Sequence, residues 1–193
     1  MLFRSDEVAI TIMEHHSNLI PWQQACERSG ARLVFLRTND AGVLDESELE
    51  KIGPATKIVS CTQLSNVLGL EVDVAAIARR AHDVGAVMVV DGAQSVPHLH
   101  VDVQALGIDL MAFSAHKLGG PMGVGVLWGR SELLERMSPV FTGGEMVDSV
   151  SESSFICSPI PEKFEAGTCN AAGIHGTDAA LTYLEEQGRD VLE

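Results

Sequence analysis

The chain has 193 residues, of which 46% are hydrophobic, and it carries a formal net charge of −14. This length and composition are sufficient for a globular domain with a core of its own. The negative charge repels phosphate backbones and anionic lipid headgroups, which argues against nucleic-acid partners and membrane surfaces. No apolar run approaches the roughly 18 residues that a membrane span needs.

The four cysteines are too scattered for a CxxC pair or a zinc-ligand spacing; they are Cys26, Cys61, Cys157 and Cys169. Because nothing in their spacing indicates a disulfide framework, we expect a reducing, cytoplasmic compartment and four buried, structural thiols. Residues 1–6 lack the charged-then-apolar order of a signal peptide.

Short β-branched runs alternate with amphipathic segments along the first part of the chain, which is βαβ order. The expected elements are strand 8–13, helix 18–29, strand 32–37, strand 57–62, helix 74–84, strand 86–90 and strand 110–114. Gly85 is expected to end the helix before it. The near-continuous apolar run 86–90 predicts a strand covered on both faces.

A further strand is expected over 123–128. It follows Lys117 too closely for a crossover helix, so we expect it to run antiparallel to its neighbour. The polar, irregular stretch 149–161 predicts a long loop. The chain starts almost directly on a strand and stops at Glu193 in what looks like an uncapped helix. We expect one α/β domain with a mostly parallel sheet, one antiparallel strand and both ends incomplete.

Two charged side chains follow apolar strands, at the sheet edge where α/β proteins bind ligands. Asp91 follows strand 86–90, and Lys117 lies just after strand 110–114. Alone, Asp91 can be a cap of the next turn and Lys117 a surface cation. Together they match pyridoxal phosphate (PLP), which needs an amine for its Schiff base and a carboxylate to keep its ring nitrogen protonated.

A polar cluster with two adjacent histidines, His15 and His16, follows the first strand. An imidazole at this strand end can stack on a flat aromatic ring and can take part in proton transfer. The alternatives are a helix N-cap cluster with Ser17 as the cap, or a metal pair. Adjacent histidines point in different directions and no third ligand has a suitable spacing, so no metal site is predicted.

Six segments resemble the class V aminotransferase superfamily, and among its members most closely the Suf-type cysteine desulfurases. The segments are EHHSNLIPWQ (14–23), SNVLG (65–69), VVDGAQSVPH (89–98), FSAHKLGGPMGVGVLWGR (113–130), GGEM (143–146) and FEAGT (164–168). The resemblance implies a PLP-dependent transferase of fold type I. It also implies that residues 1–193 are the central part of the large, PLP-binding domain, without the N-terminal segment and the C-terminal small domain.

The resemblance assigns roles to the strand-end residues. It implies that Lys117 is the catalytic lysine that forms the Schiff base and that Asp91 is the partner of the ring nitrogen. It further implies that His15 stacks on the pyridine ring and acts in catalysis, while Gln94 donates a hydrogen bond to the phenolic oxygen of the cofactor.

Four further residues match cofactor or substrate positions of the family. Asn66 matches an asparagine that contacts substrate or cofactor, and Ser114 and His116 match the phosphate-holding positions. Thr168 is expected to reach the phosphate bound by the neighbouring subunit of a homodimer. Hydroxyl, imidazole and amide donors suit these tasks.

Three positions depart from the family pattern. Ala115 stands where the family usually has glycine, which matters only if the backbone there needs a positive φ. Gln63 stands where histidine is frequent, and Cys169 stands where proline usually follows the threonine.

The resemblance implies a cysteine desulfurase that converts L-cysteine to L-alanine and supplies iron–sulfur cluster assembly, with a possible sulfur-acceptor protein as partner. A desulfurase needs a thiolate to receive the sulfur. In the family that cysteine, and an arginine for the substrate carboxylate, lie beyond Glu193, so we expect no turnover from this chain alone. Selenocysteine lyase, kynureninase-like or epimerase chemistry on the same scaffold, and a non-catalytic truncated remnant, remain the alternatives.

Overall fold

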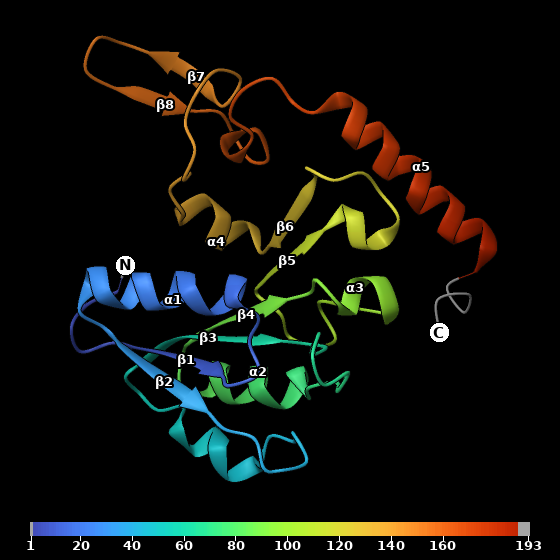
Figure 1. Ribbon diagram of the computed structural model, residues 1–193. Helices are drawn as coiled ribbons and strands as arrows, with labels where there is room; N and C mark the ends of the chain where they lie inside the picture. The colour runs from blue at the N-terminus through green and yellow to red at the C-terminus, as the bar shows by residue number, and fades with distance from the viewer. Residues whose placement is uncertain (1, 189–193) are drawn as a thin grey trace.

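The computed structural model describes residues 2–188 and shows a six-stranded sheet with helices on its faces (Figure 1). The strands are β1 (Glu7–Thr11), β2 (Arg32–Leu36), β3 (Thr56–Thr62), β4 (Val87–Asp91), β5 (Leu110–Ser114) and β6 (Gly125–Gly129). Their order is β2-β1-β3-β4-β5-β6, and β1 to β5 are parallel. Strand β6 runs antiparallel to β5, so the predicted mostly parallel sheet with one antiparallel strand is confirmed.

Helices α1 and α2 cover opposite faces of this sheet (Figure 1). The helices are α1 (His16–Ser29), α2 (Val74–Asp83), α3 (Ser95–His98), α4 (Ser131–Arg136) and α5 (Ala171–Gln187), with 3-10 turns η1 (Glu46–Lys51), η2 (Ala115–Leu118) and η3 (Glu162–Phe164). Helix α2 ends before Gly85, which has a φ of 75°. Within residues 2–188, no helix is both long enough and apolar enough to cross a membrane.

Strand β1 shows how the period of two builds both layers of the core. Val8 and Ile10 are fully buried and pack with Cys26 of α1. Ala9 points to the other face and packs in the cluster that contains Ile77 of α2. Since β1 has a neighbouring strand on each side and a helix on each face, it lies at the centre of the domain.

Strand β4 departs from the expectation that both of its faces are covered. Met88 and Val90 are fully buried in the cluster on the α2 side, whereas Val87 and Val89 are half-buried. Val89 and Val90 also border the cavity described below. The run is apolar throughout because one face borders the core and the other borders a cavity.

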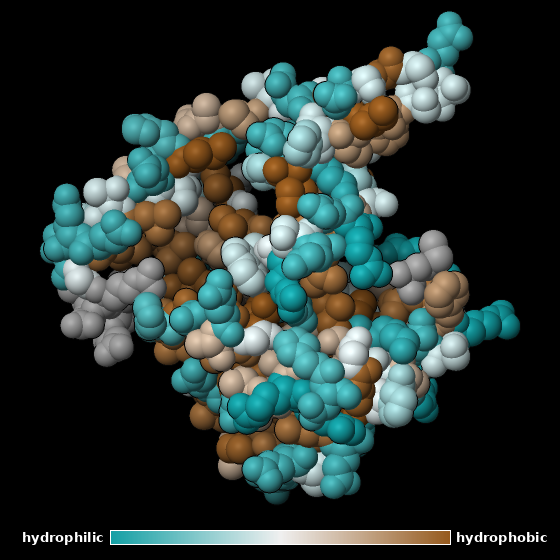
Figure 2. Space-filling view, turned by 180° about the vertical axis from the view of Figure 1, so that it is seen from behind, coloured by the Kyte–Doolittle hydropathy of each residue, from teal (hydrophilic) through white to brown (hydrophobic). Residues whose placement is uncertain are grey.

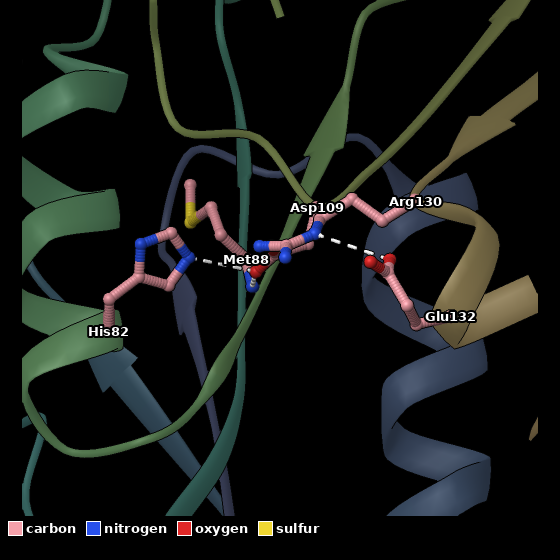
Figure 3. Close-up of polar contacts among 5 residues, drawn as sticks. All are labelled: His82, Met88, Asp109, Arg130 and Glu132. Carbon is pink, nitrogen blue, oxygen red and sulfur yellow. Dashed lines mark hydrogen bonds and ion pairs between the residues drawn. The ribbon is translucent and has the colours of Figure 1, made fainter. Parts of the chain in front are cut away.

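The amino-terminal end of the sheet is held together by one buried carboxylate, Asp109, which precedes β5 (Figure 3). Its side chain accepts hydrogen bonds from the backbone N–H of Met88 at 2.8 Å and from Nη1 of Arg130 at 3.3 Å, and it pairs with Nε2 of His82 at 2.9 Å. At the surface, Oε2 of Glu132 lies 3.8 Å from Nε of Arg130. Asp109 therefore links α2, β4 and the end of β6.

The prediction of a long loop over 149–161 is wrong, because much of this stretch belongs to a β-hairpin. Strand β7 (Val147–Val150) pairs antiparallel with β8 (Phe155–Cys157). Ser151 and Ser154 close the turn through a backbone bond of 2.8 Å. The strands are short and mostly exposed, so they carry little hydrophobic periodicity. The expected helix end at Glu193 lies outside the described residues.

Candidate active site

A cavity of about 480 Å³ opens at the carboxyl ends of the parallel strands. Parallel strands present their ends, and the loops that follow them, at one edge of the sheet. Seven of the eight residues that the sequence singles out as site residues line this cavity: His15, Asn66, Asp91, Gln94, Ser114, His116 and Lys117. The sheet therefore gathers residues that lie up to about a hundred positions apart in the sequence.

Asp91 is the last residue of β4 and stands in register with Thr62 of β3 and Ala112 of β5. Its Oδ1 accepts a hydrogen bond of 2.9 Å from the N–H of Ala93, so the side chain does cap the next turn. Its other carboxylate oxygen is not used by this cap. The capping role and the ligand role of Asp91 are thus compatible.

Lys117 lies in the single turn η2, which follows β5 directly and ends at Gly119 with a φ of 81°. Strands β4 and β5 pair with each other, so the ends that carry Asp91 and Lys117 are neighbours, as expected. Both side chains line the same cavity. A basic amine and a carboxylate therefore meet where one ligand can contact both.

His15 is the residue that caps α1, whereas the capping alternative named Ser17. The backbone of His15 is extended, and its Nδ1 accepts a hydrogen bond of 3.1 Å from the N–H of Ser17. The ring centroids of His15 and His16 are 5.9 Å apart. Across residues 2–188, no group of three or more His, Cys, Asp or Glu side chains is arranged to hold a metal ion.

Thr168 lies apart from the other site residues. It is exposed in the loop before α5 and does not line the cavity within this chain. The role expected for it involves the site of a partner subunit, and that role stays a prediction.

Two departures from the family pattern have a clear local structure. In the described part of the chain, the non-glycine residue with a positive φ is Glu145, so Ala115 occupies an ordinary backbone conformation. The change from glycine at Ala115 therefore brings no backbone strain. Gln63 is 2% exposed, and its Oε1 has no hydrogen-bond partner among the described residues.

The expectation of four buried thiols is correct for two cysteines and wrong for the other two. Cys26 and Cys61 are buried in the core, but Cys157 is half-buried and Cys169 is exposed. All four lie in the part of the chain that the structure describes, and none of them lines the cavity. No thiol of this chain is thus placed to react with a ligand bound there.

Sequence reasoning missed three residues of this region. Asn18 and Thr62 line the cavity, and Glu14 lies behind them. A signal for Glu14 exists in the sequence, because a carboxylate directly after an apolar strand stands at a sheet edge. Its importance depends on three hydrogen-bond donors that come from different elements, which the sequence pattern does not reveal.

The sequence model of the aminotransferase class-V family matches residues 2–193. The chain belongs to the class V aminotransferase family. Its sheet order and its strand-end cavity are those of a PLP-dependent class V fold, as the resemblance predicted.

Relatives in this family carry names that agree with one another. A probable cysteine desulfurase of Streptomyces coelicolor is 49% identical over 187 residues, which cover 96% of this chain and 45% of the relative. The crystal structure of cysteine desulfurase CsdA from Escherichia coli superposes with a TM-score of 0.94 at 44% identity, covering 97% of this chain and 47% of that one.

A more distant class V structure is a cystine C–S lyase, C-DES, in complex with its reaction product, cysteine persulfide. It superposes with a TM-score of 0.86 at 26% identity and covers 97% of this chain and 52% of that one. The chain spans about half the length of these relatives.

Proposed function

We propose that this chain is the cofactor-holding, central part of the large domain of a PLP-dependent cysteine desulfurase. The observation that carries the proposal is the meeting of Lys117, Asp91 and His15, from three separate strand ends, in one cavity of about 480 Å³. The 49% identity to a probable cysteine desulfurase supports the choice of reaction. The motifs EHHSN and GGEM support the Suf-type subgroup.

The side chains around the cavity fit the functional groups of PLP. Lys117 supplies the amine for covalent attachment, and Asp91 supplies a carboxylate for the ring nitrogen. His15 supplies a flat ring for stacking. Ser114 and His116 supply donors for a phosphate. The volume lies within the range of about 300–1,000 Å³ that is typical of small-molecule sites.

In this proposal, bound PLP supplies the electron sink that makes the Cα–H bond of an amino acid acidic. With the cofactor bound, the Lys117 amine would be the base that removes and returns that proton. Asp91 holds the proton on the ring nitrogen, and His15 fixes the plane of the ring. Gln94 and Asn66, which line the cavity, would orient the phenolic oxygen and the substrate.

The sulfur acceptor must be a thiolate that attacks the sulfur of bound L-cysteine, so that an S–S bond of a persulfide forms as the C–S bond breaks, and the released β-carbon takes up the proton of the substrate thiol to give L-alanine. None of the four cysteines lines the cavity, which supports a thiol supplied from outside this chain. We further propose a homodimer in which Thr168 contacts the phosphate in the partner site, and transfer of the sulfur to an acceptor protein for iron–sulfur cluster assembly.

The test is the visible absorption band of lysine-linked PLP after the chain is mixed with the cofactor. We expect the band with the wild-type chain and its loss in Lys117→Ala. The matched control is Lys57→Ala, because Lys57 is exposed on β3 and does not line the cavity. A band that persists in Lys117→Ala, or no band with the wild-type chain, contradicts the proposal.

A lyase that needs no enzyme thiol is the second candidate, and the position of the four cysteines away from the cavity favours it. The similarity to the cystine C–S lyase C-DES is consistent with this alternative. Product analysis separates the two reactions. Alanine formed from cysteine only when a thiol-bearing remainder of the enzyme is present supports the desulfurase, whereas thiol-independent cleavage supports the lyase.

A further inference from the structure

Glu14 is a buried carboxyl group directly behind the wall of the cavity. It is 9% exposed and accepts hydrogen bonds from three elements of the fold. The donors are Oγ1 of Thr11 at the end of β1, the backbone N–H of Thr62 at the end of β3 at 3.0 Å, and Nδ2 of Asn18 in α1 at 2.6 Å. One side chain thus ties two strand ends to the helix that begins after His15.

The orientation of Asn18 shows that position 14 requires acceptors on both of its oxygens. Oδ1 of Asn18 accepts from Nε1 of Trp22 at 3.0 Å and from Oγ of Ser60 at 3.0 Å. Its Nδ2 must therefore face Glu14. An amide at position 14 would turn its own NH2 group toward the donor of either Asn18 or Thr62, whereas a carboxylate accepts from both.

The pKa of Glu14 depends on its burial, on its hydrogen bonds and on the charge of Asp91 in the cavity. Burial, and to a smaller extent the negative charge of Asp91, raise the pKa of Glu14 to about 7, although the three hydrogen bonds lower it. Burial raises the pKa of the Cys61 thiol most, and the carboxylates of Glu14 and Asp91 raise it as well. Glu14, Cys61 and Asp91 therefore form one electrostatically linked group.

We propose that Glu14 is a positioning residue of the cofactor site that holds the His15 turn in place and gives up its proton when the charge of Asp91 is compensated. The cofactor part of this inference rests on the proposed PLP function. A cation beside Asp91, such as a protonated ring nitrogen, cancels the negative charge that adds to burial in favouring the protonated form of Glu14. The proton passes to solvent, and the carboxylate that remains accepts all three hydrogen bonds.

Other titratable groups lie near Glu14 and around the cavity, so a pH titration of the whole chain does not report on Glu14 alone. His15 follows Glu14 directly, Cys61 lies on β3 and Asp91 on β4, and His116 and Lys117 stand on the η2 side of the cavity. A readout specific to Glu14 is therefore needed. Trp22 provides it, because its indole N–H bonds to Asn18, which bonds in turn to Glu14.

The test follows the indole N–H resonance of Trp22 by NMR while the pH of the PLP-free chain is varied, in a Trp128→Phe background that leaves one tryptophan. We expect an inflection near the Glu14 pKa of about 7. The inflection should be absent in Glu14→Gln, and it should move to lower pH in Asp91→Asn, which removes the neighbouring charge. Asp102→Asn, an exposed site that does not line the cavity, is the control for net charge.

The absence of an inflection in the wild-type background, or an inflection that Asp91→Asn leaves unmoved, overturns the inference. Because Asp91→Asn keeps Glu14 in place, the outcome does not depend on whether Glu14→Gln folds. The titration uses no PLP, so it decides the inference even if the chain forms no visible band with the cofactor. A missing band contradicts the proposed function alone.

A swap variant separates hydrogen-bond geometry from the position of the charge. In Glu14→Gln/Asn18→Asp, the new amide donates to the new carboxylate, whose other oxygen still accepts from Trp22 and Ser60. We expect PLP to bind roughly tenfold more weakly to Glu14→Gln, because the NH2 group of the new glutamine faces an N–H of either Asn18 or Thr62. The double variant should recover most of this loss. Equal affinity of wild type and Glu14→Gln contradicts the positioning role.

Discussion

The two parts of the chain differ in how completely they bury their own apolar side chains. In residues 7–118, side chains such as Ile10, Ile77 and Met88 are at most 1% exposed, and two helices cover the parallel strands. In residues 119–188, Met146 is buried, yet Val140 and Phe141 are 89% and 78% exposed. The parallel part therefore has a core of its own, and the second part presents apolar surface outward.

Figure 2 shows this contrast as apolar surface gathered around a hollow in the upper half of the molecule, where α5 and the β7–β8 hairpin lie. A contiguous apolar area of this kind usually marks a surface that another body covers. The cavity residues from His15 to Lys117 all belong to the self-contained part. Most of the site thus rests on the parallel core, while β6 of the second part supports it at one place, where it pairs with β5 next to Ser114.

The largest effect is expected from Asp109→Ala, which removes the carboxylate at the amino end of the parallel sheet. The N–H of Met88 and the side chains of Arg130 and His82 lose their common partner. Leaving the buried N–H of Met88 without an acceptor, together with the loss of two hydrogen bonds to partly exposed side chains, costs about 4 kcal/mol of the free energy of unfolding, measured by urea titration. Glu132→Ala, at the exposed end of the same network, is the matched control and should cost under about 0.5 kcal/mol.

The pH dependence of stability gives the next largest effect. Since burial raises the pKa of Glu14 from 4.5 to about 7, the folded chain holds this proton more tightly than the unfolded chain. The resulting stabilisation is complete below about pH 4.5 and is lost as the pH rises to about 7, by roughly 3 kcal/mol. Urea titrations across this range should show the fall in wild type and in the control Glu50→Gln, but not in Glu14→Gln. If the free energy of unfolding of Glu14→Gln still falls over this pH range, another titratable group causes the fall.

The same substitution at two isoleucines, one in each part, compares how far the two parts bury their apolar side chains. Ile77→Val removes one methylene from a side chain that is 1% exposed in the parallel core. The free energy of unfolding should fall by about 1 kcal/mol. Ile174→Val makes the same chemical change in α5, where the side chain is 50% exposed, and its effect should be near zero. Equal costs at the two positions would mean that the second part is covered in solution.

The smallest change in stability is expected from Phe141→Ser, which should stay within about 0.5 kcal/mol because this side chain is 78% exposed. The same change should lower the fluorescence of a bound hydrophobic dye, because it interrupts the apolar area. Loss of dye binding without loss of stability would show that Phe141 belongs to an uncovered surface. A stability loss above about 1 kcal/mol would contradict this.

The sequence predicted the parallel part well because its helices and strands have clear local patterns of apolar residues. Strands such as 86–90 are dense in β-branched and apolar residues, and Asp91 and Lys117 follow strands whose ends the topology brings together. The β7–β8 hairpin was not predicted, because three- and four-residue strands with exposed side chains show no clear alternation. The bonds of Glu14 join residues up to 48 positions apart, so no local pattern encodes them.

The strand order has a consequence for synthesis on the ribosome. Strand β1 lies between β2 and β3, and all five of its residues are buried, although both partners follow it in the chain. At about 5–20 residues per second, the interval between the end of β1 at Thr11 and the end of β3 at Thr62 takes roughly 3–10 seconds. During that interval the nascent chain carries a buried-type strand that still lacks at least one of its two neighbours. A chaperone that binds short extended apolar segments would find a target there.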